Sequence, residues 1–165
     1  MESLDRFVAA VDPALVVVTT AVDGERAGCL VGFHCQASIE PEQYATWISR
    51  LNRTVRLAAR AEWLAVHYLD ESQLDVAAHF GAQTGDDVDK FATIPWTPGP
   101  YGVPLLGACP DRLVLRRITT LDVPGADHLC VVSSVADGAF SSDAAGPLRL
   151  SDAANLSPGH EADDS

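Results

Sequence analysis

The chain has little positive charge. It carries 11 lysine and arginine residues against 23 aspartate and glutamate residues, for a formal net charge of −12, and Lys90 is its one lysine. This balance excludes nonspecific electrostatic binding to nucleic acid, because neutralising its phosphates requires a positively charged surface. Any anionic ligand must therefore be held locally, by arginine side chains, hydroxyl groups and backbone N–H groups.

Long hydrophobic runs are also absent, and cysteines are few. No run approaches the roughly 18–20 apolar residues of a membrane-spanning helix, and residues 1–7 lack the basic and apolar regions of a signal peptide. We therefore expect a cytoplasmic protein with no membrane partner. The four cysteines, at positions 29, 35, 109 and 130, form no Cys-x-x-Cys pair, which disfavours a zinc knuckle and a disulfide framework. The aspartates of 86–89 lack the ligand spacing of a calcium loop, so no metal site is expected.

The composition is that of one globular domain. Apolar residues make up 47% of the 165 residues and charged residues 21%, which is ample material for a core. We expect this domain to span residues 1–150. Residues 151–165 are small and polar, and we expect them to form a disordered tail.

Strands dominate the predicted secondary structure. Apolar, β-branched runs predict six of them, at 14–22, 26–39, 44–48, 63–69, 113–119 and 129–135. Asp23-Gly24 is a type I′ hairpin signal between the first two. Short helices are expected at 2–11, 52–61 and 71–80, and a long loop at 82–110. Because strands do not alternate regularly with helices, the pattern favours a closed or half-closed antiparallel barrel over a parallel sheet.

Two neighbouring segments carry polar groups that could bind a ligand. Residues 28–41 combine glycines with His34, Gln36 and Ser38, so backbone N–H groups there could approach a planar ligand. Residues 48–56 end a strand and begin a helix at Asn52. Free backbone N–H groups at the helix start, together with the side-chain hydrogen-bond donors of this segment, would form a phosphate-binding site, called the phosphate cradle below. The alternatives are a solvated barrel strand and an ordinary capped helix with exposed arginines.

Two later segments bear chemistry of other kinds. His128 follows Asp127 at a turn, and its imidazole could stack on or hydrogen-bond to a redox ring; the alternative is a turn histidine with no task. Phe80, Phe91 and Trp96 flank Lys90 in this part of the chain, and these rings could form a wall over a flat ligand or could simply belong to the core. His67, within an apolar strand, is expected to be buried rather than catalytic.

In chain order, these segments resemble the flavin reductase-like family of FMN-binding split-barrel proteins. The resemblance runs from about Leu15 to Leu150. It covers VVVTTAVDGERAG, the segment ending SIEP, SRLNRT, LAVHYL, QLDVAAHFG, DKF, the W-x-x-G-x-x-G-x-P-L-L-G-A stretch at 96–108, and finally DH. Each piece is weak alone, and their common order is what makes the resemblance specific.

The resemblance implies a mainly β fold, a six-stranded antiparallel split barrel with Greek-key links and two or three short helices. It also implies a homodimer that binds flavin near the subunit interface. Members of this family typically pass a hydride from NADH or NADPH to FMN or FAD, and many supply reduced flavin to a separate monooxygenase. The nicotinamide and flavin carry this chemistry, so the protein needs no nucleophile.

The resemblance also assigns site residues. The flavin ring and ribityl chain would lie along Gly32, Phe33, His34, Cys35, Gln36 and Ser38. The phosphate-binding turn would comprise Ser49, Arg50, Asn52 and Thr54. Phe80, Lys90 and Phe91 would border the site, and His128 of the G-D-H element would position the nicotinamide.

This chain departs from the family pattern in several places. Its flavin strand lacks two hydroxyls of the usual S-S-F-x-S-V-S, Glu42 replaces a proline, and Ala126 replaces the glycine of G-D-H. The chain is thus a divergent member, which leaves the flavin, the reductant and the substrate open. The alternatives are a flavin- or deazaflavin-binding protein with another reductant or substrate, and a non-catalytic ligand-binding barrel.

Overall fold

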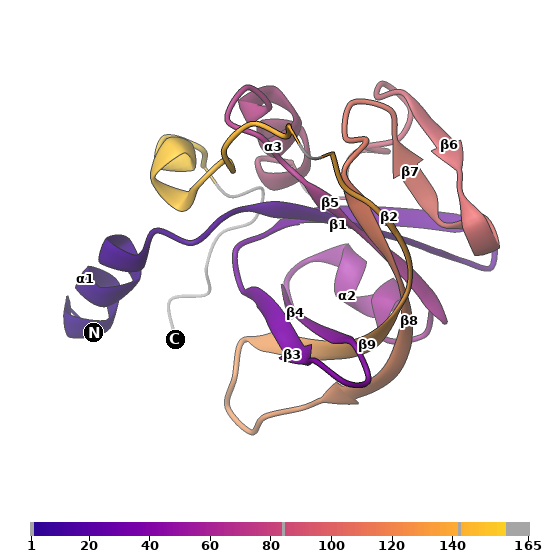
Figure 1. Cartoon of the computed structure of the whole chain (residues 1–165), viewed down its shortest axis with the longest axis horizontal. Coiled ribbons are helices and arrows are strands. Elements are labelled where there is room, and N and C mark those ends of the chain that lie inside the picture. The colour runs from indigo at the N-terminus through magenta and orange to yellow at the C-terminus, as the bar shows by residue number, and fades with distance from the viewer. Residues whose placement is uncertain (1, 84, 142, 158–165) are drawn as a thin grey trace.

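Seven strands form one antiparallel sheet that curls on itself (Figure 1). The computed structural model describes residues 2–83, 85–141 and 143–157. The strands are β1 (Val16–Val22), β2 (Glu25–Val31), β3 (His34–Ser38), β4 (Gln43–Ser49), β5 (Trp63–Tyr68), β8 (Arg112–Leu121) and β9 (His128–Ala139). Their order across the sheet is β2-β1-β5-β8-β9-β4-β3.

The curl follows from the connection between the two edge strands. β2 and β3 lie at opposite edges of the sheet, yet only Gly32 and Phe33 separate them in the chain. Because each residue spans at most about 3.6 Å, the two edges must approach one another, and the sheet becomes a half-barrel. The predicted single strand over 26–39 is therefore two strands. The expectation of six strands is wrong: the main sheet has seven.

Other sequence predictions can be compared directly. Asp23 and Gly24 have φ angles of 53° and 79°, which confirms the hairpin turn between β1 and β2.

The segment 82–110, expected to be a loop, contains a small antiparallel pair, β6 (Trp96–Pro98) and β7 (Pro104–Leu106). The sequence pattern did not predict this pair, because each strand has only three residues and one of the three is proline.

The barrel interior is filled by strand side chains and by helix α2 (Arg53–Ala58), which lies within the curl of the sheet (Figure 1). Its Val55 and Ala58 pack against apolar side chains of six strands. The buried strand residues are Val16, Val18, Cys29, Val31, Ile48, Leu64, Val66, Leu115, Leu129 and Val131. This packing fixes the start of α2 beside the gap between the two edge strands.

A second layer covers the outer face of β1 and its neighbours. Helix α3 (Leu74–Gly81) places Phe80 here, next to Val17 of β1. The α3 helix ends at Gly81, which packs closely on β2: a Cβ atom would lie 2.8 Å from the end of the Leu30 side chain, which would have to shift. Glycine thus serves close packing of helix on strand here, rather than the left-handed cap that its position suggests.

The chain beyond Leu148 also folds onto the barrel. We expected a disordered tail from residue 151, but Leu150–Ala153 form a 3-10 helix, η2. Ser151 donates its backbone N–H and its hydroxyl to the carboxylate of Asp12, at 2.8 and 2.7 Å. Residues 158–165, the rest of that expected tail, lie outside the described residues.

Helix α1 (Glu2–Val11) confirms the predicted N-terminal helix, but none of its residues is buried. Its apolar side chains Leu4, Phe7 and Val11 are 65%, 68% and 57% exposed, and the helix stands apart from the sheet (Figure 1). Among the described residues, no helix has the length and apolar character needed to cross a membrane.

Candidate functional site

A groove of about 440 Å³ opens where β2 gives way to β3. Its volume lies within the range of small-molecule sites, about 300–1,000 Å³. The groove is positioned by the split in the sheet, because Gly32 and Phe33 connect the two edges there and line it. At Gly32, a Cβ atom would lie 3.4 Å from Leu15, so its absence leaves room beside the backbone.

Six of the residues predicted from sequence line this groove. They come from four separate parts of the chain: Gly32, Phe33, Ser49, Asn52, Phe80 and His128. The register explains the meeting of two of them, since Ser49, the last residue of β4, is paired with His128, the first residue of β9. Asn52 precedes α2, and its side chain makes no capping hydrogen bond.

The imidazole of His128 has defined neighbours. Its ring lies 4.8 Å from that of Phe33, centroid to centroid. Its Nδ1 atom is 2.7 Å from Oδ1 of Asp127. Because an ionised carboxylate only accepts hydrogen bonds, Nδ1 carries the proton, and Nε2 is the acceptor of the neutral ring. The same hydrogen bond lowers the pKa of the Asp127 carboxyl below its ordinary value.

The apolar part of the groove lining was missed by the sequence analysis. It comprises Leu150, Ala153 and Leu156, together with Leu15 and Leu30. The first three recur every third residue, the period of the 3-10 helix that begins the segment. That spacing was the signal available in the sequence, and the polar residues around it obscured it.

Three predicted residues line a different cavity. Thr54, Lys90 and Phe91 face a space of about 420 Å³ between the start of β2, the start of α2 and residues 85–91. Nζ of Lys90 donates to the carbonyl groups of Phe80 at 2.8 Å and Gly28 at 3.2 Å. Burial lowers the pKa of Lys90. This lysine therefore satisfies backbone carbonyl groups instead of facing the groove.

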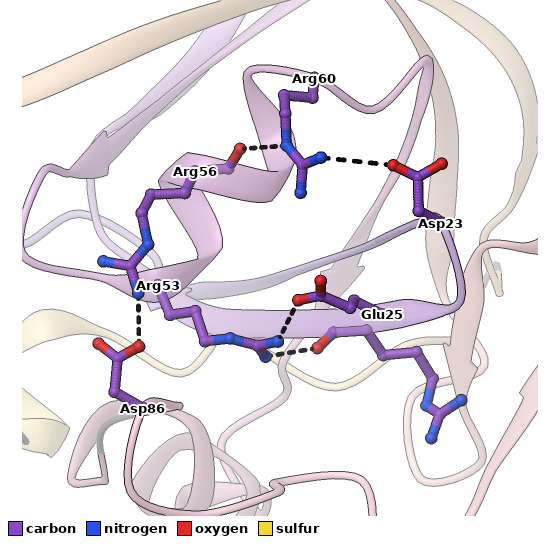
Figure 2. A network of polar contacts seen from close by, with 7 residues as sticks. Asp23, Glu25, Arg53, Arg56, Arg60 and Asp86 are labelled. Carbon is purple, nitrogen blue, oxygen red and sulfur yellow. Dashed lines mark hydrogen bonds and ion pairs between the residues drawn. The ribbon is translucent and has the colours of Figure 1, made fainter.

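The arginines of the α2 region are paired with the protein's own carboxylates (Figure 2). Arg53 donates to Glu25 at 2.6 Å and to the carbonyl of Arg26 at 2.9 Å. Arg56 pairs with Asp86, and Arg60 lies 3.4 Å from Asp23. A chain with a net charge of −12 thus neutralises the basic groups of this region internally.

The expected phosphate cradle is therefore not assembled as one unit. Ser49 and Asn52 line the groove, whereas Thr54 is buried beside the second cavity. Arg50 turns to a third place, where Nη2 lies 2.5 Å from Asp122. Its Nε donates to the carbonyl of Ala126 at 3.0 Å.

The remaining predicted residues lie on β3, away from the lining of the groove. Both ring nitrogens of His34 have protein partners, Tyr44 Oη at 2.7 Å and the carbonyl of Ala14 at 2.8 Å. Cys35 and Gln36 are exposed on this edge strand, and Ser38 ends it. Where the sequence suggested a ligand-facing strand, His34 instead connects β3 to β4 and to the residues before β1. In the described part of the chain, no three His, Cys, Asp or Glu residues gather as a metal site.

Comparison with known proteins places these features in context. The sequence model of the "Flavin reductase like domain" family matches residues 10–154. The chain is similar to "Flavin-dependent monooxygenase, reductase subunit HsaB" of Mycobacterium tuberculosis H37Rv, with 31% identity over 73% of this chain and 62% of the relative. It is also similar to the protein of that name from Rhodococcus jostii RHA1, with 35% identity over 55% of this chain and 46% of the relative. The matches thus span less than two thirds of these relatives.

Solved structures share the fold. The flavin reductase HpaC complexed with NADP+ has a TM-score of 0.77 and 22% identity, over 90% of this chain and 92% of that one. The NADH:FAD oxidoreductase SgcE6 of Streptomyces globisporus C-1027 has a TM-score of 0.78 and 21% identity, over 88% of this chain and 85% of that one. These likenesses establish a common architecture.

Proposed function

The chain belongs to the flavin reductase like domain family, and from that premise we propose that it is an NAD(P)H-dependent flavin reductase. In this proposal the groove holds FMN or FAD, and NADH or NADPH binds next to it as the reductant. The single observation that supports the site is the convergence of Gly32, Phe33, Ser49 and His128 on one groove that apolar residues also line.

The residues of the groove suit a flat, partly polar ligand. A flavin bound here would supply the redox chemistry, because its ring system can accept a hydride. The protein would have to bring the flavin and the nicotinamide together in a reactive orientation and to exclude water. The apolar wall of Leu150, Ala153 and Leu156 would exclude water. Nε2 of His128, which also lines the groove, would accept a hydrogen bond from the nicotinamide carboxamide and so orient that ring.

We place the flavin phosphate at the start of α2. Ser49 and Asn52 line the groove there, and the Asn52 amide makes no capping bond that would hold it back. Backbone N–H groups of Gly32 and Phe33 would stabilise negative charge on the polar edge of the flavin ring. This set is smaller than the phosphate-binding turn expected from sequence, because Arg50 pairs with Asp122 and Thr54 is buried beside the second cavity.

We further propose that the reduced flavin serves a partner monooxygenase. The support is the role of the relatives described above, which are named as reductase subunits of a flavin-dependent monooxygenase. The partner and the final substrate are separate questions from flavin reduction. Flavin reduction itself can be tested on the purified chain alone.

The test of the proposed function is an anaerobic titration. The purified chain is mixed with FMN or FAD, binding is followed by quenching of flavin fluorescence, and NADH or NADPH is then added while the visible flavin band is recorded. We expect saturable binding of at least one flavin, and bleaching by at least one nicotinamide at a rate that scales with protein. Bleaching by dithionite alone would favour the alternative of another reductant. Absence of flavin binding would leave a non-catalytic barrel.

We also propose that two copies associate, and that α1 takes part in the contact. The apolar side chains of Leu4 and Phe7 are 65% and 68% exposed. Exposure of this apolar surface to water is unfavourable in free energy unless another surface covers it. Light scattering after size exclusion should give twice the 17.5 kDa of one chain. The variant Leu4→Glu/Phe7→Glu should shift the mass toward one chain, whereas Glu2→Gln on the same helix should not. A wild-type chain that is monomeric at all concentrations would contradict this.

A further inference from the structure

The turn that leads to His128 is held by Arg50. This turn, residues 122–127, connects β8 to β9. The backbone N–H of Arg50 donates to the carbonyl of Asp127 at 2.9 Å. Its Nε donates to the carbonyl of Ala126 at 3.0 Å, and its Nη2 lies 2.5 Å from Oδ1 of Asp122. One residue thus contacts the first residue of the turn and its last two.

These contacts lie just beyond the end of a strand ladder. The β4–β9 pairing ends at Ser49 and His128, so the backbone orientation of His128 depends on how the turn before it is held. The turn includes Gly125 with a φ of 79°, a conformation that glycine adopts without strain. Arg50 directly follows Ser49. Its contacts therefore fix the turn at a point one residue beyond the end of the β4–β9 pairing.

We propose that Arg50 is a positioning residue, which keeps the imidazole of His128 facing the groove beside Phe33. This inference rests on the proposed function, in which His128 contacts the nicotinamide. It replaces the expectation that Arg50 binds the flavin phosphate. The contacts of Arg50 give it a geometric role: the guanidinium presents its N–H groups as a rigid fork, and two of them reach two separate acceptors on the turn.

The two roles predict opposite outcomes for a lysine at this position. A lysine keeps the positive charge that a phosphate ligand needs, but its single ammonium group cannot reproduce the fork. Arg50→Lys should therefore behave like Arg50→Gln if Arg50 holds the turn, and like the wild type if it holds a phosphate. The exposed ion pair with Asp122 offers a second variant, Asp122→Asn, on the turn itself.

The experiment measures three quantities for wild type, Arg50→Gln, Arg50→Lys and Asp122→Asn. They are the dissociation constants of FMN and riboflavin, kcat and KM for NADH and NADPH, and the NMR signals of the ring nitrogens of His128. Riboflavin is the informative probe because it lacks the phosphate. Arg60→Gln is the matched control, since Arg60 is exposed, lies 3.4 Å from Asp23 and is far from the turn in the chain.

We expect both Arg50 variants to lower kcat/KM for the nicotinamide by about tenfold, as displaced catalytic groups do. The ratio of FMN to riboflavin affinity should stay constant, and the ring signals of His128 should shift. Asp122→Asn should change the same quantities in the same direction, and Arg60→Gln should change none. A loss of FMN affinity in Arg50→Gln, with riboflavin binding intact and Arg50→Lys normal, would overturn the inference.

The NMR readout separates this inference from the proposed function. If the chain reduces no flavin, the proposed function fails, yet the ring signals of His128 still report whether Arg50 orients it. If flavin reduction is present and those signals are identical in wild type and both Arg50 variants, the positioning role fails while the proposed function stands. His128→Gln identifies the His128 signals among those of the five histidines.

Discussion

Acidification from pH 7 to pH 4 is expected to lower the free energy of unfolding by up to about 3 kcal/mol through one side chain, His67. This histidine lies on β5 and is fully buried. Its Nδ1 donates to the carbonyl of Val17 at 3.2 Å, and its Nε2 accepts from the backbone N–H of Leu106 at 3.1 Å. The neutral ring therefore satisfies both partners, and it connects the barrel to the outer β6–β7 pair.

Protonation of this ring is unfavourable in the folded state. Burial lowers the pKa of His67 from 6.5 to about 4, the Val17 carbonyl opposes that change, and the charge of Arg112 adds to it. A proton on Nε2 would also face the N–H of Leu106 instead of serving as its acceptor. Between pH 6.5 and 4 the unfolded chain binds the proton and the folded chain does not, so stability falls as pH falls through this window.

The measurement is urea unfolding at several pH values, for wild type and for His67→Gln. The variant has its own cost, so the slope of the free energy of unfolding against pH is the quantity to compare. We expect the slope between pH 6.5 and 4 to be shallower in His67→Gln than in the wild type. Asp12 and Asp127, whose pKa values hydrogen bonds hold below 3.8, lose their contributions at lower pH. Equal slopes in wild type and His67→Gln would refute the assignment.

His67 also illustrates what local sequence can predict. An isolated histidine within the apolar run of residues 63–69 indicates a buried ring, and the structure confirms that. The hairpin at Asp23-Gly24 and helix α1 were predictable for the same reason, because the signal lies in a few adjacent residues. Fold class followed from the dominance of strands.

The features that failed depend on distant partners. Nothing in residues 26–39 alone indicates that the chain leaves one edge of the sheet at Gly32 and joins the other, which is why seven strands were read as six. The charge pairing of Arg50 with Asp122, 72 residues away, is equally hidden. A pattern can identify an arginine as a candidate phosphate ligand, but the carboxylate that occupies it becomes visible only in three dimensions.

The ring of Phe80 shows how closely the core and the candidate site are connected. It is 1% exposed, it lines the groove, and its edge approaches Phe91 with the ring centroids 5.9 Å apart. β2 accommodates it through Gly28, where a Cβ atom would lie 2.8 Å from the ring. This contact between helix α3 and strand β2, which adds to that of Gly81 with Leu30, is therefore made by the ring on α3 and by the missing side chain on β2.

Phe80→Ala is expected to cost about 3–5 kcal/mol of stability, because it removes a buried ring and leaves a cavity. The matched control is Phe140→Ala, since Phe140 is 66% exposed. That substitution should change stability by about 0.5 kcal/mol or less. Urea unfolding of both variants gives the comparison. A cost below about 1 kcal/mol for Phe80→Ala would mean that this region collapses around the cavity, or that the ring is not packed as described.

A double substitution tests the Phe80–Gly28 contact itself. Gly28→Ala alone should destabilise the protein by about 1–3 kcal/mol, because the added methyl group overpacks the site. In the Phe80→Ala background that methyl group would enter the space the ring has left, so its cost should fall or change sign. The coupling free energy from this cycle measures the contact directly. Strict additivity of the two substitutions would show that the glycine is not there to admit the ring, and that α3 contacts β2 in another way.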